Sequence, residues 1–572
     1  MKVLGIHDGH NGSAALYEDG VILAAIQEER LYYQKNWTGY PEQSVKWVLE
    51  STGTAPLDID AVVFNGHHMP KKLSKDEMIE AHKLRWDMKA KVKSFLKKGV
   101  VGQKFTEARQ KERIQDAVSS GFLASQVEFI DHHKCHASAA YHGWGRYDEP
   151  ILVLTCDGAG DRICASVNIG EKGKLTRISS VPETESIGSL YACITTVMGF
   201  APLEHEYKLM GMAPYADPKY AKPVADIFRE HFAFNPDDKL TWKRVAGSPP
   251  PYFGYWYWRD KLAGIRFDSI MGGLQIFAEE FIAQWVENCI KHTGASKVAL
   301  GGGFFMNVKA NKVIMELDAV TDMFVFPSCG DEMNAPGACF AYASDKGEGM
   351  GIPALENIYW GPSYTDDEIK GCLDAYSRKD EVIAEYFGEK VNSKVASLLV
   401  DGEVVARFSG REEMGARSLG NRAILANPTD SEVITLINKM IKKRDFWMPF
   451  ASSIKIEHRH DYLVNPKDVS SPYMILTFDT TDEGQEKLRA GTHPQDKTIR
   501  PQEVSQASNP DYWDLINKFE KLTGQGGILN TSFNLHGLPV VHTPEQALDV
   551  FLDSGLTSLQ LEGYLVRKVN GE

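Results

Sequence analysis

Two stretches of the chain repeat one pattern, and this repeat restricts the fold more than any other feature. "VLGIHDGHNGSAALYEDGVILAAI" begins at Val3, and "VLTCDGAGDRICASVNIGEKGKLTRI" begins at Val153. Each is an apolar run that ends near Asp-Gly, then a turn, a second run, another turn and a third run. Apolar runs bounded by turn residues predict strands. The repeat therefore predicts two related half-domains that face each other.

The Asp-Gly turns indicate what such half-domains could bind. Glycine lets backbone N–H groups approach a phosphate, and an aspartate at a strand end can face a metal ion or water. This is the outline of the actin-like and sugar-kinase ATPase architecture, in which a nucleotide lies between duplicated lobes. Asp-Gly is also a common hairpin turn, so the two copies alone do not separate a nucleotide site from plain hairpins.

A third glycine-rich stretch supports a nucleotide site. "KVALGGGFFMNVKANKVI" (297–314) predicts a strand, a loop at Gly301, Gly302 and Gly303, and a helix. Backbone amides of such a loop can pack against adenosine or phosphate. It is not a Walker A loop, because no GK[ST] follows at the required spacing. The alternative is a strand-to-helix turn that uses glycine for close packing.

"DHHKCHASAAYH" (131–142) holds four histidines and a cysteine. Asp131 can cap a helix, which the alanines that follow favour. On a helix, His132 and His136 share one face and can reach one ion. His133 points about 100° away, and Cys135 lies off that face as a candidate nucleophile. A helix whose histidines are capped or half-exposed is the alternative.

Two aspartates favour a metal over that alternative. Asp157 ends a predicted strand of the second repeat, and Asp331 follows another predicted strand and precedes a Gly/Ala-rich helix. Two histidines and two carboxylates suit Fe(II), Mn(II) or Zn(II), with positions left for phosphate or water.

The length and composition of the chain exclude several classes of protein. The chain has 572 residues, and a net charge of −14 argues against a general nucleic-acid binder. The start at Met1 shows no secretory signal, and no apolar run is long enough to span a membrane. Eight cysteines without a CxxC pair fit a reducing compartment, so we expect a cytoplasmic protein.

Two further stretches allow two interpretations each. Residues 71–113 hold fourteen Lys/Arg against six Asp/Glu, which suits a phosphorylated or nucleic-acid partner or a solvated helical insertion. "PPPYFGYWYWRD" (249–260) could line an acceptor pocket or pack a loop onto the core. A Gly- and Pro-rich segment at 345–368 predicts a boundary, giving domains 1–350 and 351–572.

Ordered motifs along nearly the whole chain resemble the NodU/CmcH family of O-carbamoyltransferases. They are "HDGHNGSAAL", "EERL", "DHHKCHASAA", "CDGAGD", "EHEYKLMGMAPYA", "GGGFFMNVKAN", "PSCGDEMNAPGA", "GREEMGARSLGNRAILA", "INKMIKKRDFWMPFA" and "LNTSFNLHGLPVV". The resemblance implies an α/β protein of two modules. The first is a duplicated actin-like domain similar to the metal-containing enzyme that transfers threonylcarbamoyl to tRNA, and the second is a YrdC-like α/β domain.

The resemblance also implies site residues. It places a metal, expected to be Fe(II), with Mn or Zn as alternatives, on His132, His136, Asp157 and Asp331. It places Gly301, Gly302, Gly303 and Asn307 beside the nucleotide, and a KxR…SxN set at Lys442, Arg444, Ser532 and Asn534. Arg417, Arg422 and Arg500 are expected to meet phosphates. Many relatives have arginine where this chain has Met448, which removes one expected phosphate contact.

The implied activity has two steps. Carbamoyl phosphate and ATP, with Mg, give carbamoyl adenylate in the second domain, and the first domain transfers carbamoyl to a hydroxyl of a small-molecule acceptor. His133 or His10 could take the hydroxyl proton. Two alternatives are threonylcarbamoyl transfer to tRNA, which only the basic stretch supports, and a non-catalytic actin-like ATP-binding module. The acceptor, the native metal and a homodimer are left open.

Overall fold

The computed structural model describes residues 1–69, 74–97, 100–442 and 445–569. The chain forms two compact units. The first contains Met1–Glu28 and Asn36–Leu355, and the second contains Glu29–Lys35 and Glu356–Glu572. The boundary predicted from the sequence did not include the short segment Glu29–Lys35. Across the described ranges, every helix is too short or too polar to cross a bilayer.

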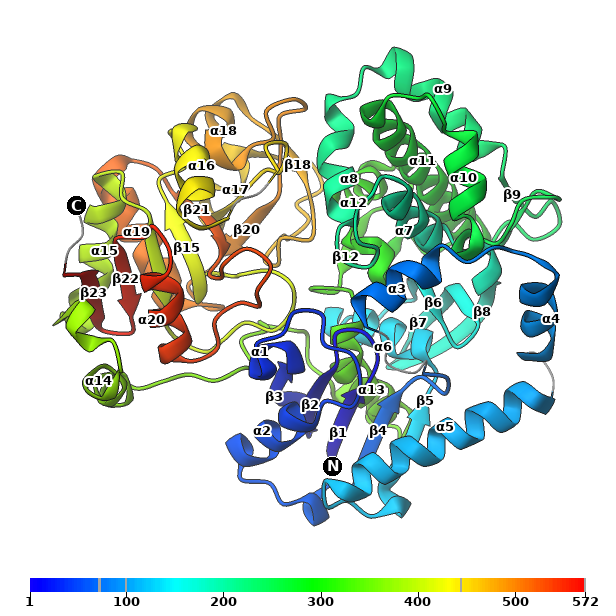
Figure 1. The fold of residues 1–572 in the computed structure, drawn as a ribbon, viewed down its shortest axis with the longest axis horizontal. Coiled ribbons are helices and arrows are strands. Elements are labelled where there is room, and N and C mark those ends of the chain that lie inside the picture. Colours follow the sequence, from blue (N-terminus) through cyan, green and yellow to red (C-terminus); the bar gives the residue numbers. More distant parts are fainter. Residues whose placement is uncertain (70–73, 98–99, 443–444, 570–572) are drawn as a thin grey trace. The chain divides into compact units, whose positions relative to one another are not determined.

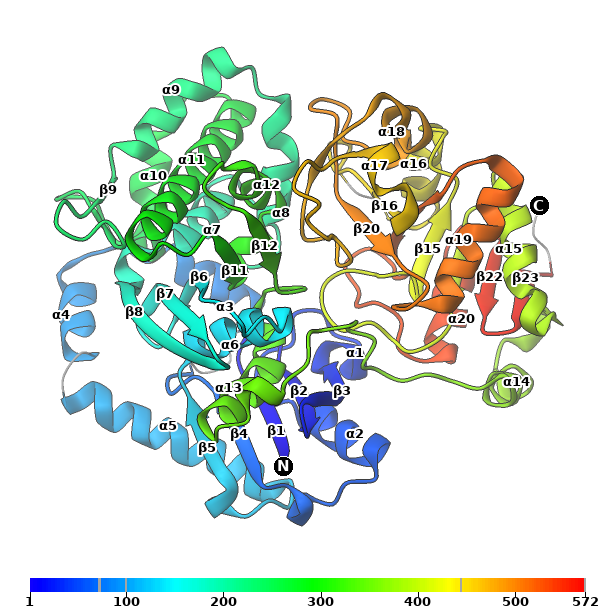
Figure 2. The ribbon, with the colours of Figure 1, turned by 180° about the vertical axis from the view of Figure 1, so that it is seen from behind.

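The first unit contains two five-stranded sheets of the same topology (Figures 1 and 2). The first sheet has the order β3-β2-β1-β4-β5, and the second, taken from its other edge, has the order β8-β7-β6-β11-β12. The strands of the first sheet are β1 (Lys2–His7), β2 (Ser13–Glu18), β3 (Val21–Gln27), β4 (Ala61–Asn65) and β5 (Val127–Ile130). Those of the second sheet are β6 (Ile151–Gly160), β7 (Ile163–Glu171), β8 (Lys174–Pro182), β11 (Lys297–Gly301) and β12 (Asp322–Val325).

The pairing is also the same in both sheets. β1 is antiparallel to β2 and parallel to β4, and β6 is antiparallel to β7 and parallel to β11. The predicted duplication and the mixed α/β class are therefore confirmed, in the arrangement expected of an actin-like ATPase fold.

Each sheet is followed in sequence by a helix that packs on the other sheet. α6 (His132–Trp144) follows β5 of the first sheet but packs on β6 and β11 of the second. α13 (Asn334–Asp345) follows β12 of the second sheet but packs on β1, β2 and β4 of the first. The two helices pack on each other between the sheets, where Gly337 allows the backbones to approach closely. Their N-terminal ends carry the residues described in the next section.

Helices surround this frame (Figure 1). α3 (Lys75–His82), α4 (Met88–Lys97) and α5 (Val100–Ser119) are inserted between β4 and β5. α7 (Ile187–Val197) packs on β6, and the long α11 (Phe267–Thr293) packs on α9 (Pro218–Arg229) and α12 (Val308–Glu316). α10 (Tyr255–Lys261) packs on α7.

The second unit is a mixed sheet of eight strands in the order β13-β23-β22-β14-β15-β21-β16-β20. The strands of this sheet are β13 (Val382–Tyr386), β23 (Tyr564–Lys568), β22 (Ser558–Leu561), β14 (Val405–Phe408), β15 (Arg422–Ala426), β21 (Gly527–Ser532), β16 (Ala451–Lys455) and β20 (Pro501–Val504). A small sheet of β17 (Leu463–Val464), β18 (Phe478–Thr480) and β19 (Thr498–Ile499) stands beside it.

Each face of the large sheet has its own core. Side chains alternate across a strand, and Val405 joins one apolar cluster while its neighbour Ala406 joins the other. α14 (Asp366–Ala375), α16 (Glu432–Ile437) and α20 (Pro544–Leu552) contribute to the cluster of Ala406. α15 (Val391–Val400) and α19 (Pro510–Thr523) contribute to the cluster of Val405. The unit is therefore a sheet between two helical layers.

Candidate functional site

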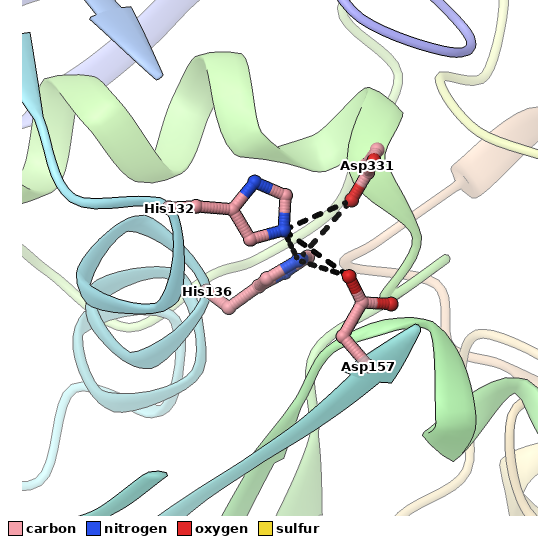
Figure 3. Close-up of side chains that lie close together, drawn as sticks. All are labelled: His132, His136, Asp157 and Asp331. Atoms are coloured by element: carbon pink, nitrogen blue, oxygen red, sulfur yellow. Dashed lines mark hydrogen bonds and ion pairs between the residues drawn. The ribbon is translucent and has the colours of Figure 1, made fainter. Parts of the chain in front are cut away.

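Four side chains of the first unit point toward one another (Figure 3). His132 and His136 lie on the first two turns of α6, Asp157 lies in β6, and Asp331 lies just before α13. One ligand atom from each residue can be chosen so that all four atoms lie within 4.8 Å of one another. The two helices that cross between the sheets thus bring together residues separated by up to 199 positions along the chain.

The distances suit a single ion. Nε2 of His132 lies 3.2 Å from Oδ2 of Asp157 and 3.4 Å from Oδ1 of Asp331. Nε2 of His136 lies 3.3 Å from Oδ1 of Asp331, 3.1 Å from Nε2 of His132 and 4.0 Å from Oδ2 of Asp157. Bonds of about 2.0–2.2 Å to one ion separate neighbouring ligands by about 2.8–3.6 Å. The donor set of two nitrogens and two oxygens therefore fits a divalent transition metal.

Local contacts hold α6 in place at this centre. The side chain of Asp131 caps the helix by accepting from the backbone N–H of Lys134 at 2.8 Å. The carboxylate of Asp161 accepts from the backbone N–H of His132 at 2.8 Å and from that of His68 at 2.7 Å. Asp161, in the "CDGAGD" motif, thus fixes the first turn of the helix that carries both histidines.

Burial and charge act against each other at the centre. Burial alone would lower the pKa of His132, but the carboxylates of Asp331 and Asp157 outweigh it and raise that pKa to about 9. Burial alone would raise the pKa of Asp331, but His132, His136 and His7 hold it well below its usual range. Two partly buried carboxylates beside two buried histidines form a favourable site for a cation.

The first repeat has an equivalent of Asp157 with a different partner. Asp8 follows β1 as Asp157 ends the matching run in β6, but Arg113 of α5 donates to both its carboxylate oxygens at 2.8 Å. Both Asp8 and Arg113 are buried, and the guanidinium also donates to the carbonyl oxygen of Gly66 at 2.7 Å. Only the second copy of the repeat therefore offers its carboxylate to an ion.

The two candidate bases differ in their contacts. His133 is fully buried, with Nδ1 2.7 Å from the hydroxyl of Thr155 and Nε2 3.1 Å from the carbonyl oxygen of Ile163. Burial and, to a smaller extent, the neighbouring His132 lower the pKa of His133 to about 3. Nε2 of His10 donates to the carbonyl oxygen of Leu203 at 3.3 Å, and its Nδ1 has no hydrogen-bond partner in the described part of the chain. These contacts favour His10 over His133 as a base.

The glycine loop lies directly against the metal centre. The backbone N–H of Gly303 donates to Oδ1 of Asp157 at 3.0 Å. Gly302 has φ of 100°, and a Cβ there would collide with the carbonyl oxygen of Cys156, so glycine is required. A Cβ at Gly301 would lie 2.7 Å from the carbonyl oxygen of His136. Asn307 caps α12 through the N–H of Ala310 at 3.1 Å, and the predicted nucleotide contacts of the loop stay predictions.

In the second unit, three members of the KxR…SxN set meet. Nζ of Lys442 donates to Oδ1 of Asn534 at 2.6 Å and to the hydroxyl of Ser532 at 3.2 Å, and it also contacts the carbonyl oxygen of Ser532. Lys442 is buried. Arg444 lies outside the described residues, so its predicted role stays a prediction.

The predicted phosphate arginines lie in different surroundings. Arg422 is fully buried, its guanidinium lies 3.7 Å from the ring centre of Phe408, and it donates to the carbonyl oxygen of Gly410 at 3.0 Å. These are contacts that fix the loop before β15. Arg417 and Arg500 are half-buried, and their phosphate contacts stay predictions.

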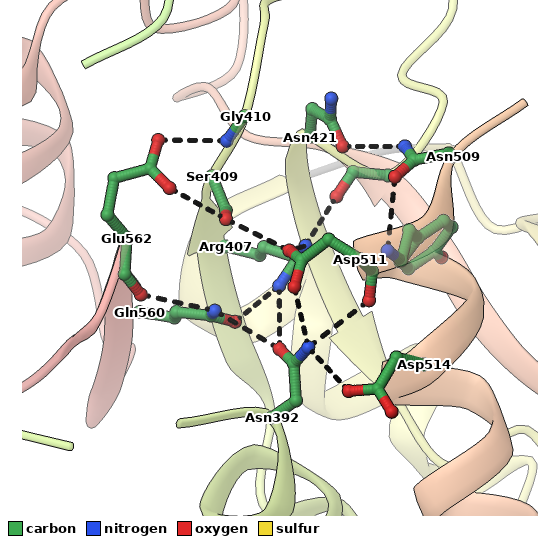
Figure 4. A network of polar contacts seen from close by, with 12 residues as sticks. Asn392, Arg407, Ser409, Gly410, Asn421, Asn509, Asp511, Asp514, Gln560 and Glu562 are labelled. Atoms are coloured by element: carbon green, nitrogen blue, oxygen red, sulfur yellow. Dashed lines mark hydrogen bonds and ion pairs between the residues drawn. The ribbon is translucent and has the colours of Figure 1, made fainter. Parts of the chain in front are cut away.

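A polar network supports the same loop (Figure 4). The buried guanidinium of Arg407 donates to Gln560 at 2.7 Å and to the carbonyl oxygen of Gly420 at 3.0 Å, and pairs with Asp511 of α19. Glu562 accepts from the N–H of Gly410 at 2.8 Å. The sequence motif gave no sign of Arg407, because its partners Gln560 and Asp511 lie 153 and 104 positions away along the chain.

The aromatic stretch 249–260 lies partly in the core and partly along an open pocket, and its predicted role in binding an acceptor stays a prediction. Trp258 is buried in the core, whereas Phe253, Trp256 and Tyr257 line an open pocket of about 310 Å³ together with Trp86. Arg85 and Asp87 are also part of its wall. The rings of Trp86 and Phe253 lie 4.9 Å apart, and Arg85 lies 4.6 Å from the ring centre of Trp256.

Comparisons with known proteins agree with this organisation. The family models "Carbamoyltransferase N-terminus" and "Carbamoyltransferase C-terminus" match residues 2–340 and 396–568. The chain is 30% identical to the nodulation protein NolNO of Sinorhizobium fredii, covering 98% of this chain and 79% of that protein. It is also 30% identical to the uncharacterized protein sll1178 of Synechocystis, covering 98% and 95%.

The chain also aligns with a solved structure, that of component A of the (R)-2-hydroxyglutaryl-CoA dehydratase of Acidaminococcus fermentans. The TM-score is 0.32 and the identity 14%, and the alignment covers 60% of this chain and 98% of that one. The two family models together cover most of the chain: the C-terminal match lies within the second unit, and the N-terminal match covers most of the first unit together with Glu29–Lys35 of the second. This chain belongs to the carbamoyltransferase family and is an enzyme that transfers carbamoyl groups.

Proposed function

We propose that the protein is an ATP-dependent O-carbamoyltransferase that works in two steps, one in each unit. The convergence of His132, His136, Asp157 and Asp331 carries the proposal, because a carbamoyl group is poorly electrophilic and its transfer benefits from a cation beside the leaving phosphate. The native metal is expected to be Fe(II), with Mn or Zn as alternatives.

The second unit makes the activated intermediate. Water hydrolyses carbamoyl phosphate to carbamate and phosphate, and a carbamate oxygen then attacks the α-phosphorus of ATP. Pyrophosphate leaves, and carbamoyl adenylate forms. Lys442, held by Ser532 and Asn534, supplies a fixed positive charge for this displacement, and Mg accompanies ATP. Arg417 and Arg500 are proposed to contact the phosphates.

The first unit transfers the group. The acceptor hydroxyl oxygen attacks the carbamoyl carbon, its proton passes to Nδ1 of His10, and AMP leaves. When bound, the divalent ion supplies a Lewis acid that offsets charge on the departing phosphate. The glycine loop orients Asp157 through the N–H of Gly303, and its amides are proposed to contact the nucleotide.

The open aromatic pocket is proposed to receive the acceptor. Apolar faces of Trp86 and Trp256 can stack on a ring of the acceptor, while Arg85 and Asp87 can hydrogen-bond its hydroxyls. Transfer of threonylcarbamoyl to tRNA is the competing enzyme class, and an extract-derived acceptor that gains one carbamoyl mass would separate the two.

Two variants of the full chain test the division of labour. Asp331→Asn should keep carbamoyl-phosphate-dependent pyrophosphate release within a few-fold of the wild type while transfer falls by at least about 100-fold. Lys442→Ala should reduce pyrophosphate release itself by about 100–1000-fold. The matched control is Asp345→Asn, the same change at an exposed aspartate of the first unit.

Both steps are measured with carbamoyl phosphate, ATP and an extract of the source organism, by pyrophosphate assay and mass spectrometry. If the wild type releases pyrophosphate at the same rate with and without carbamoyl phosphate, the proposal is contradicted and a simple ATP-binding module is favoured. Equal loss of pyrophosphate release in both variants would contradict the assignment of one step to each unit.

A further inference from the structure

Asn65, the last residue of β4, is fully buried with its amide between two imidazole rings. Its Nδ2 lies 2.9 Å from Nδ1 of His7 and 3.3 Å from Nδ1 of His132. Its Oδ1 is buried and meets no hydrogen-bond donor among the residues that the structure describes. A buried carbonyl oxygen without a donor is unfavourable, so this placement calls for a reason.

The contacts of His7 fix which of its nitrogens carries hydrogen. Its Nε2 lies 2.9 Å from the backbone carbonyl oxygen of His10, and a carbonyl oxygen can only accept. Nε2 therefore donates, and Nδ1 of the neutral ring is an acceptor. The Nδ2–H of Asn65, at 2.9 Å, is the donor that this nitrogen requires.

His132 requires the opposite arrangement when it binds an ion. Its Nε2 faces Asp157 and Asp331, so this nitrogen must present a lone pair and the ring hydrogen must lie on Nδ1. An Nδ1–H cannot face the Nδ2–H of Asn65, because two donors repel. It needs an acceptor, and metal-ligating histidines regularly donate their second N–H to a carbonyl or carboxylate oxygen.

One orientation of the amide satisfies both rings. Both needs would be met by an amide whose Nδ2 is directed to Nδ1 of His7 and whose Oδ1 is directed to Nδ1 of His132, which requires the side chain to reorient from its present position. The shorter of the two distances is already that to His7, and the oxygen that lacks a donor gains one.

We propose that Asn65 is a positioning residue of the metal centre. Its Oδ1 accepts from Nδ1–H of His132 and its Nδ2 donates to His7, so that one amide sets the tautomers of a metal ligand and of its neighbour. The inference rests on the metal role proposed above and does not depend on carbamoyl transfer.

Metal affinity tests this inference directly. The full-length protein is stripped of metal with a chelator and titrated with Co²⁺, whose visible spectrum reports binding. Asn65→Ala should weaken Co²⁺ binding by about 10–100-fold, because His132 loses its acceptor. Asn65→Asp should bind within a few-fold of the wild type, because a carboxylate oxygen still accepts from Nδ1–H of His132.

A matched control separates positioning from a general loss of stability. Asn168 in β7 is also buried, and its Nδ2 donates to the carbonyl oxygen of Val153 at 3.1 Å and to the hydroxyl of Ser166 at 2.9 Å. Asn168→Ala should lower the melting temperature yet bind Co²⁺ as the wild type does. ¹⁵N NMR of the Zn²⁺-loaded wild type should show a protonated Nδ1 on His132.

Co²⁺ binding by Asn65→Ala equal to that of Asn168→Ala would overturn the inference, as would an unprotonated Nδ1 in the Zn²⁺-loaded protein. If Asn65→Ala does not fold, the comparison of Asn65→Asp with the wild type and the NMR signal still decide. A wild type that binds no Co²⁺ would overturn the metal role and this inference with it, whereas the pyrophosphate assay would still test adenylate formation.

Discussion

At the scale of single residues, the chemistry depends on which histidine nitrogens are already engaged. His133 uses both ring nitrogens inside the fold, on Thr155 and Ile163. His10 uses only Nε2, on the carbonyl oxygen of Leu203. A general base needs a lone pair that is not already engaged. Nδ1 of His10 is buried but has no partner among the described residues, so it is the better candidate.

Replacement of these two histidines should have different effects. His10→Gln should lower transfer from preformed carbamoyl adenylate by about 100-fold or more, because the acceptor hydroxyl loses its base. His133→Gln can keep hydrogen bonds to Thr155 and Ile163 and should transfer within a few-fold of the wild type. Single-turnover transfer rates measure both effects, and a His10→Gln enzyme as fast as the wild type would remove His10 from the mechanism.

At the scale of elements, α6 has one buried histidine far from the metal ligands. His142, near the C-terminal end of the helix, has Nδ1 3.1 Å from the hydroxyl oxygen of Tyr147, which itself donates to the carbonyl oxygen of Ile352 at 2.7 Å. Burial lowers the pKa of His142 from 6.5 to about 3. The ring is therefore neutral in the folded protein at neutral and mildly acidic pH.

This burial should make the helix sensitive to acid. Between pH 6.5 and about 3 the unfolded chain binds a proton at His142 that the folded chain does not, so stability is full above pH 6.5 and falls as the pH falls. The loss is about 1.4 kcal/mol of unfolding free energy per pH unit for this residue. His142→Gln should lose less stability between pH 7 and 5 than the wild type in urea denaturation. Parallel losses in the two proteins would contradict the assignment.

At the scale of the whole molecule, local sequence patterns predicted the two related halves of the first unit but not the contacts between residues that are distant in sequence. The Asp-Gly repeats are local, and they correctly predicted two related halves, which the structure forms as two sheets of the same topology. The spacing of His132 and His136 is local too, and it correctly placed both on one face of a helix. Asp157 and Asp331 came from strand ends together with the family resemblance, and the structure brings them to the histidines.

Other parts of the site depend on contacts that no local pattern records. Asp8 and Asp157 follow similar runs, but only Asp8 meets an arginine, because α5 is inserted in the first copy alone. Asn65 ends an ordinary buried strand, and its place between His7 and His132 follows from sheet pairing.

The division of the chain into two units also depends on contacts that no local sequence pattern records. The segment Glu29–Lys35 follows β3 directly in sequence, yet it belongs to the second unit. There the buried Arg30 pairs with Glu412 at 3.1 Å and donates to the carbonyl oxygen of Gly415 at 2.9 Å. Glu412 also accepts from Nδ1 of His542 at 2.7 Å. Partners this distant in sequence leave no local signal at Arg30.

The metal centre is tested most directly by anomalous X-ray scattering from crystals of the full-length protein loaded with Fe²⁺ under anaerobic conditions, with data collected on both sides of the iron absorption edge. We expect one anomalous peak in the first unit, within bonding distance of both His132 and His136 and of the carboxylates of Asp157 and Asp331. A peak elsewhere, or none at this position in crystals that hold one iron per chain, would contradict the proposed metal centre.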